Sequence, residues 1–329
     1  MKVDGFPLQS NVHFPSDYNL ALDAVRKCLS IVQKITKGTT IQGWRKHQDW
    51  LRKSRNRCRN LGKVSVGGGK NKSTRLAGAA VNYLSICREV SDKLKESAPA
   101  FSATSSASPV RTALLLGLDY YEKMLDKHID LIFRRLIKGE VIPHAEKMFS
   151  LFEPYTEWIK KGKSGNRVDL GLNVVIATDQ YDYILAHRVL EQEHEVQSAL
   201  PLINTIKQKY NLQLASMSFD KGFWSPENRQ ALKPLVELLV LPKKGKRNAV
   251  ENEREHTAAF IHYRHKHAAV ESNINCLNHH SLDRCPDHGI DHFRSYVSLG
   301  ILGYNLHKLG NDLRVREARR RKRRQPAAA

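Results

Sequence analysis

The 329-residue sequence lacks the features that mark membrane and secreted proteins. It has no run approaching the ~20 apolar residues that a membrane-spanning helix needs, and no signal peptide opens it. Its five cysteines are odd in number and widely spread, which is typical of reduced thiols in a cytosolic protein. We therefore predict a cytoplasmic protein that contacts no membrane.

Two common catalytic motifs are also missing. The run Gly67-Gly68-Gly69-Lys70 is not a phosphate-binding loop, because Asn71 follows the lysine and no glycine stands five residues before Gly69. No nucleophile elbow or comparable spacing supports a serine or cysteine nucleophile, although fifteen histidines are available. The chemistry of this chain must come from other residue types.

Acidic residues are scarce relative to basic ones. The sequence has 54 Lys and Arg against 33 Asp and Glu, a formal net charge of +21. Such an excess favours a polyanionic partner, with nucleic acid as the leading candidate; the alternative is an unusually basic globular protein or a ribosome-associated factor. We expect double-stranded DNA as the partner and an association with the nucleoid.

Two of the acids stand where a metal-dependent nuclease needs them. Residues 212–219 read as a short apolar strand that ends on Asp220, and a carboxylate at the end of a strand is well placed to hold a cation. A long stretch without Gly or Pro later carries Glu271, and helical spacing puts it on one face with Arg264, His267 and Asn278. Glu271 therefore shares a face with groups able to touch phosphate.

A third acid, Asp4, lies just before the segment VHFPSD at 12–17. Asp4 with that segment, Asp220 in SFDKGFWSPEN and Glu271 in AAVESNIN resemble the three acids of a bacterial insertion-sequence DDE transposase. The resemblance covers nearly the whole chain, including FEPYTEWIKKGKSG, ATDQYDYI and LDRCPDHG. It implies a catalytic domain similar to RNase H and retroviral integrase.

The resemblance implies that Asp4, Asp220 and Glu271 are the catalytic acids and that they bind two Mg²⁺ ions, which Mn²⁺ can replace. The implied reaction is nicking at the transposon ends, followed by attack of the freed 3′-hydroxyl on target DNA. Coordinated cutting at two ends implies a homodimer or higher assembly on DNA.

The phosphate-holding groups depart from the family pattern. Relatives often carry Tyr, Arg and Lys at seven before, four before and seven after the helical Glu; these places are Arg264, His267 and Asn278 here. We predict that Arg264 and His267, together with Lys243 and Lys244, contact DNA phosphates.

Transposases of this kind have a separate DNA-recognition region ahead of the first acid, whereas Asp4 is only three residues from Met1 here. We expect either that the true start lies upstream or that this is a truncated copy. The alternative function is therefore a non-catalytic, DNA-binding remnant of a truncated transposase.

The order of predicted elements gives an α/β fold class. We expect an RNase H-like mixed sheet flanked by helices, with a large all-helical insertion after the first strand. The predicted boundaries are the first strand at 1–17, the insertion at 18–150, the remaining core at 151–312 and a basic disordered tail at 313–329.

The insertion contains the densest basic segment. Residues 41–75 hold eleven Lys or Arg and one acid, Asp49, with Trp44 and Trp50 interleaved. We predict DNA contact through phosphates, with the tryptophans packing or stacking; the alternative is a solvated helix face with both tryptophans in the core. The predicted DNA-binding residues of this segment are Arg45, Lys46, Arg52, Lys53, Arg55, Arg57 and Arg59.

One competing metal site remains open. Cys276 with His279, and Cys285 with His288, have spacings that could ligate zinc, and the alternative is ordinary packing beside the last helix.

Overall fold

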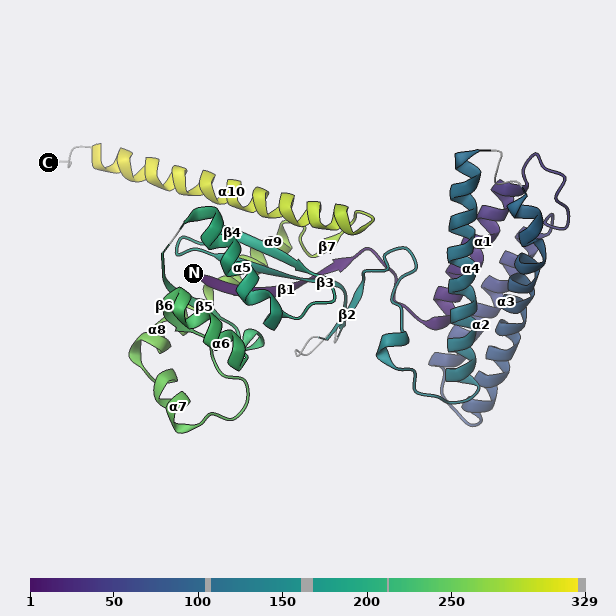
Figure 1. Ribbon diagram of the computed structural model, residues 1–329, viewed down its shortest axis with the longest axis horizontal. Helices are drawn as coiled ribbons and strands as arrows, with labels where there is room; N and C mark the ends of the chain where they lie inside the picture. Colours follow the sequence, from purple (N-terminus) through teal and green to yellow (C-terminus); the bar gives the residue numbers. More distant parts are fainter. Residues whose placement is uncertain (104–107, 161–167, 212, 325–329) are drawn as a thin grey trace. The chain divides into compact units, whose positions relative to one another are not determined.

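The computed structural model describes residues 1–103, 108–160, 168–211 and 213–324 (Figure 1). The chain forms two compact units, which we call the sheet unit (1–12 with 155–329) and the helical unit (13–154). Among the described residues, no helix combines the length and apolar character needed to cross a bilayer.

The sheet unit is built on a mixed sheet. The strands follow the order β2-β3-β1-β5-β6, while β4 also pairs with β3 and β7 pairs with β1. Strand β1 is antiparallel to β3 and parallel to β5. The bounds are β1 Lys2–Ser10, β2 Glu157–Lys160, β3 Val168–Thr178, β4 Ile184–Leu190, β5 Leu214–Phe219, β6 Val236–Val240 and β7 Arg284–Cys285. This confirms the predicted class, a mixed α/β fold consistent with an RNase H-like layout and carrying a helical insertion after β1.

Helices cover both faces of this sheet. The alternation of β1 sends Val3 to one apolar cluster, with Leu202 of α5, and Phe6 to another, with Leu277 of α9 and Phe293 of α10. The helices of the unit are α5 Glu195–Tyr210, α6 Pro226–Leu232, α7 Ala249–Glu255, α8 Ala258–His267, α9 Ala269–His279 and α10 Ile290–Arg324.

The helical unit is a bundle of amphipathic helices with its own core. Ser16 and Ser108 cap two of its helices, each accepting a hydrogen bond from the backbone N–H three residues on. The core contains Val25, Tyr83 and Leu125, none of which is exposed to solvent. The helices are α1 Asp17–Thr36, α2 His47–Val66, α3 Lys72–Ser102 and α4 Pro109–Leu136.

The prediction of a disordered basic tail from residue 313 is wrong for the described part, because α10 continues to Arg324. Forming the first turn is the unfavourable step in helix formation. Because the first half of α10 is already helical and packed on the sheet unit, further turns are added at little cost in free energy. Arg, Lys, Ala and Glu favour helix, no Gly or Pro occurs after Gly310 up to Arg324, and Glu317 accepts a hydrogen bond from Arg321 at 2.6 Å. Residues 325–329 lie outside the described part.

The uninterrupted helix predicted around Glu271 is divided at Ala268. Helix α8 packs against β5 and β6, whereas α9 packs against β1 and α10, so the chain changes direction between them. Arg264 and His267 therefore lie on a different helix from Glu271.

Candidate active site

The three predicted acids sit on neighbouring elements of the sheet unit. Strands β1 and β5 run parallel, with Val3 paired to Phe219, so Asp4 and Asp220 follow directly on adjacent strands. Glu271 lies in the first turn of α9, which packs over β1. Asp4 is half-buried, while Asp220 and Glu271 are exposed.

The pKa of Asp4 shows that these acids lie within electrostatic range of one another. Burial, the largest cause, and the negative charges of Asp220, Glu195 and Glu271 together raise the pKa of Asp4 from 3.8 to about 7. The backbone N–H of Gly5 donates to Asp4 Oδ1 at 2.8 Å and opposes this shift of the pKa. The structure thus brings all three predicted acids within electrostatic range of one another.

Glu195 is a fourth acid in this place, and the sequence did not reveal it. It is the first residue of α5, and its carboxylate lies against two glycines that follow the predicted acids. A Cβ added at Gly5 would stand 2.6 Å from Glu195 Oε1, and one at Gly222 would stand 2.3 Å from Oε2. The same point at Gly222 is 3.8 Å from Asp220 Oδ2. A side chain at either position would force the Glu195 carboxylate to turn away, so both glycines leave room for it in its present place.

Glu195 is held here without a direct partner. Its side chain makes no hydrogen bond or ion pair with any described residue. Burial raises the pKa of Glu195, and the charge of Asp220 raises it further, while Lys244 acts in the opposite direction. A half-buried carboxylate beside another carboxylate is destabilised by desolvation and repulsion, and carboxylates perturbed in this way are typical of ligand-binding sites.

The donor set fits hard divalent cations. Mg²⁺ and Mn²⁺ prefer carboxylate oxygens, and a cation would relieve the repulsion that raises the pKa of Asp4 and Glu195. The cradle formed by Gly5 and Gly222 also admits the fourth carboxylate. However, no three His, Cys, Asp or Glu side chains of the described chain are close enough to hold one ion as they stand. The fold gathers the acids but does not assemble a complete coordination shell.

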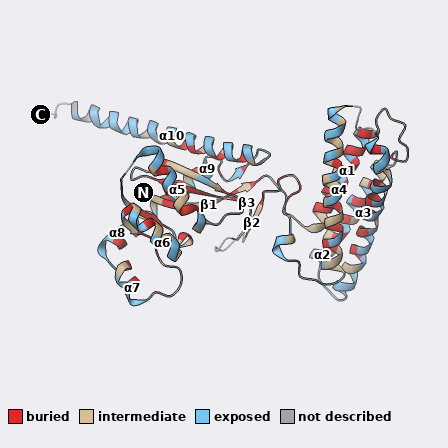
Figure 2. Ribbon diagram, in the orientation of Figure 1, coloured by how far each residue is buried: buried red, intermediate tan, exposed pale blue. Residues whose placement is uncertain are grey.

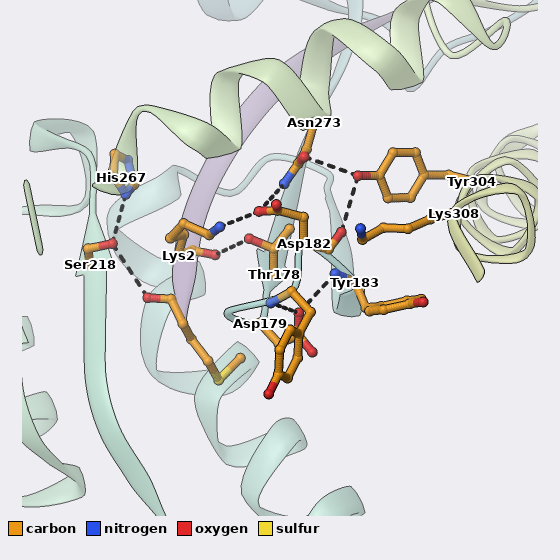
Figure 3. A network of polar contacts seen from close by, with 12 residues as sticks. Lys2, Thr178, Asp179, Asp182, Tyr183, Ser218, His267, Asn273, Tyr304 and Lys308 are labelled. Carbon is orange, nitrogen blue, oxygen red and sulfur yellow. Dashed lines mark hydrogen bonds and ion pairs between the residues drawn. The ribbon is translucent and has the colours of Figure 1, made fainter. Parts of the chain in front are cut away.

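A polar network fixes the helix of Glu271 to the strand of Asp4 (Figure 3). Asp182, in the turn between β3 and β4, accepts hydrogen bonds from Lys2 Nζ and, at 3.3 Å, from Asn273 Nδ2. The Tyr304 hydroxyl lies 3.0 Å from Asn273 Oδ1 and 3.1 Å from the carbonyl oxygen of Asp182. Lys2 and Asn273 are each two residues from an acid, so the network sets how α9 sits on β1.

His267 does not have the environment of a phosphate-binding cation. Its Nδ1 lies 3.0 Å from Ser218 Oγ on β5 (Figure 3). Burial lowers the pKa of His267, against the raising effect of Asp220 and Glu271, so the ring is neutral at pH 7. It lies at the acid site as a neutral imidazole.

Lys243, Lys244 and Arg264, the other cations predicted to contact phosphate in the sheet unit, have different surroundings. Lys243 is engaged within the fold: its Nζ is 2.5 Å from Glu251 and stands over the Trp224 ring. Lys244 is exposed and within electrostatic range of Glu195. Arg264 is exposed and forms no ion pair with a described residue. Lys244 and Arg264 are thus the two available for a phosphate.

The basic segment of the helical unit lies mostly in solvent. Of the seven predicted residues, Arg45, Lys46, Arg52, Lys53, Arg55 and Arg59 are exposed and Arg57 is half-buried. Arg52 and Lys53 both pair with Asp49. Arg57 donates to the carbonyl oxygen of Asn82 at 2.7 Å and helps to line a hollow of about 370 Å³ between α2 and α3. This surface has the charge for phosphate contact.

The tryptophans of this segment do not form a stacking surface. Trp44 and Trp50 are 4 % and 9 % exposed and pack against each other at 5.5 Å. Their indole N–H groups donate to Ser97 and Glu89. They are core residues of the bundle, so any nucleic-acid contact here depends on the cations alone.

The proposed zinc pairs are not assembled into a site. Cys285 is buried in β7, and His279 is exposed at the end of α9. These residues belong to no metal-binding group of three within the described ranges.

Comparisons with known proteins add no family. No family model matches the chain, and no curated protein or solved structure is significantly similar to it.

Proposed function

We propose that this chain is a metal-dependent DNA transposase of the DDE type, which nicks DNA at transposon ends and joins the 3′-hydroxyl to target DNA. The observation that carries the proposal is the gathering of Asp4, Glu195, Asp220 and Glu271 at the adjoining ends of β1 and β5. The mixed α/β fold and the net charge of +21 support it.

Each residue has a role in this proposal. Asp4, Asp220 and Glu271, joined by Glu195, would hold two Mg²⁺ or Mn²⁺ ions. Bound there, the cations supply nucleophile activation and stabilise the leaving oxygen. Lys244 and Arg264 would orient the scissile phosphate, because both are exposed and Lys244 lies within electrostatic range of Glu195. The exposed cations of α2 and of the end of α10 would hold the DNA backbone.

A second candidate is a DNA-binding protein that cuts nothing. It is favoured by the lack, within the described ranges, of three side chains placed as a coordination shell. The two functions are separated by incubating supercoiled plasmid with the protein in Mg²⁺, Mn²⁺ or EDTA, with binding measured in parallel by gel shift. Metal-dependent open circles support the transposase; binding without nicking in either metal leaves the second candidate.

Glu195 provides a test that concerns this chain's own geometry. We expect Glu195→Gln to reduce metal-dependent nicking by roughly ten- to a hundredfold, because one carboxylate of the site is neutralised. The concentration of Mn²⁺ needed to raise the melting temperature should increase as well. Glu193→Gln is the matched control, since Glu193 lies two residues away and pairs with Arg188. Equal losses in both variants would remove Glu195 from the site.

The basic surface of α2 provides a second test. We expect DNA affinity to fall steeply as salt rises. Arg55→Gln with Arg59→Gln should reduce the slope of log K against log salt by about 0.9 for each phosphate that the double variant no longer binds. Lys123→Gln is the control, because Lys123 is exposed on α4 but paired with Asp119. An unchanged slope in the double variant would exclude these arginines as phosphate-binding groups.

A further inference from the structure

Helix α10 is apolar on two opposite faces. One face packs on the sheet unit through Phe293, Val297, Ile301 and Tyr304, all less than 9 % exposed. The opposite face lies in solvent along its length (Figure 2). A helix that rests on a core needs only one apolar stripe, so the second stripe has no purpose within the sheet unit.

The exposed stripe consists of five leucines at regular spacing. Their exposed fractions are 67, 53, 59, 45 and 54 %, for Leu299, Leu302, Leu306, Leu309 and Leu313 in turn. The intervals are three, four, three and four residues, which is the repeat of a coiled-coil seam. Single exposed leucines are common on protein surfaces, but five in one heptad register on one helix are not.

Two glycines beside this stripe share its period. Gly303 and Gly310 are seven residues apart in the interior of α10, and a Cβ at either would meet nothing within 4 Å. Glycine is among the least favourable residues inside a helix. Gly300, by contrast, is filled by Leu282. Packing inside the chain therefore explains Gly300 but neither Gly303 nor Gly310, and both would allow another helix to approach closely.

We propose that this leucine face, 299–313, pairs with the same face of α10 in a second copy of the chain, forming a two-helix coiled coil. A heptad stripe is complementary to itself, as a two-fold interface requires. Covering five half-exposed leucines on each copy removes about 1,000 Å² of surface from water, the lower limit for a specific interface.

The charges of α10 favour an antiparallel pair. Residues 314–324 contain eight Lys or Arg and one acid, Glu317. In a parallel pair the basic segments of the two copies would lie side by side and repel each other, whereas in an antiparallel pair they lie at opposite ends. In that arrangement, centred on Leu306, Leu299 of one copy lies beside Leu313 of the other.

The oligomeric state tests the proposal. We expect sedimentation velocity of the full-length protein at tens of micromolar to show a dimer, and the Leu302→Gln/Leu309→Gln variant to show a monomer with unchanged helical circular dichroism. Leu116→Gln is the control, because Leu116 is 68 % exposed on α4, outside the stripe; it should remain dimeric. A monomeric wild type, as when another protein covers the face, or a dimeric double variant would overturn the proposal.

Cross-linking tests the orientation and does not depend on DNA cleavage. We expect a mixture of Leu299→Cys and Leu313→Cys chains to form a disulfide-linked pair on mild oxidation, well above the level for Leu116→Cys. Efficient linking of Leu299→Cys to itself would instead show parallel helices and overturn the antiparallel arrangement.

Discussion

Asp220→Asn is expected to reduce metal-dependent nicking by roughly a thousandfold, the size of effect seen when a preorganised electrostatic group is removed from an active site. Asp220 ends β5 beside Asp4, and its charge acts on Asp4, Glu195 and His267. The measurement is the initial rate of plasmid nicking in Mg²⁺ and in Mn²⁺.

DNA binding should respond differently to the same substitution. Affinity is expected to stay equal or to rise, because a negative charge is removed near the phosphates. Glu237→Gln is the matched control, since Glu237 is an exposed acid on the neighbouring strand β6. If Asp220→Asn nicks DNA as fast as Glu237→Gln, Asp220 has no catalytic role.

Asp4→Asn is expected to stabilise the protein at pH 8 and to leave it unchanged at pH 4. The pKa of Asp4 is raised in the folded state, to about 7 from 3.8, so the folded protein holds this proton more tightly than the unfolded chain. Stability is therefore lost as pH rises from about 4 through 7, when the buried carboxyl ionises. Asparagine escapes this loss and can still accept from the N–H of Gly5.

The size of this gain in stability follows from the pKa shift of Asp4. We expect a gain of roughly 2 kcal/mol at pH 8, about half of what the full shift represents, because water still reaches part of the side chain. Urea unfolding in EDTA at pH 4, 6 and 8 measures it. Mg²⁺ should restore the stability of the wild type at pH 8 but add little to the variant. A gain that is the same at pH 4 and pH 8 would contradict the assigned shift.

The strands and their acids could be predicted because they follow local rules. The apolar run before Asp220 marked β5. The position of Asp220 at a strand end then followed from chain order. These features depend on residues that are close together in the chain, so a single sequence is enough to predict them.

Glu195 could not be predicted because its role depends on the fold. An acid in the first turn of a helix usually interacts with the helix dipole, and nothing local separates Glu195 from that case. Its closeness to Asp4 exists only after α5 packs on the sheet. For the same reason the sequence did not reveal the break at Ala268 between helices that rest on different strands, and it left open whether Trp44 and Trp50 belong to the core.

The glycine cradle also predicts how this chain can vary in evolution. A side chain at either position 5 or position 222 would occupy the space of the Glu195 carboxylate. Relatives that keep an acid at the start of α5 should therefore keep glycine at both places, and a lineage that gains alanine at either should lose or shorten the acid. This covariation links three positions far apart in sequence. It offers a signature for finding distant homologues whose overall similarity has disappeared.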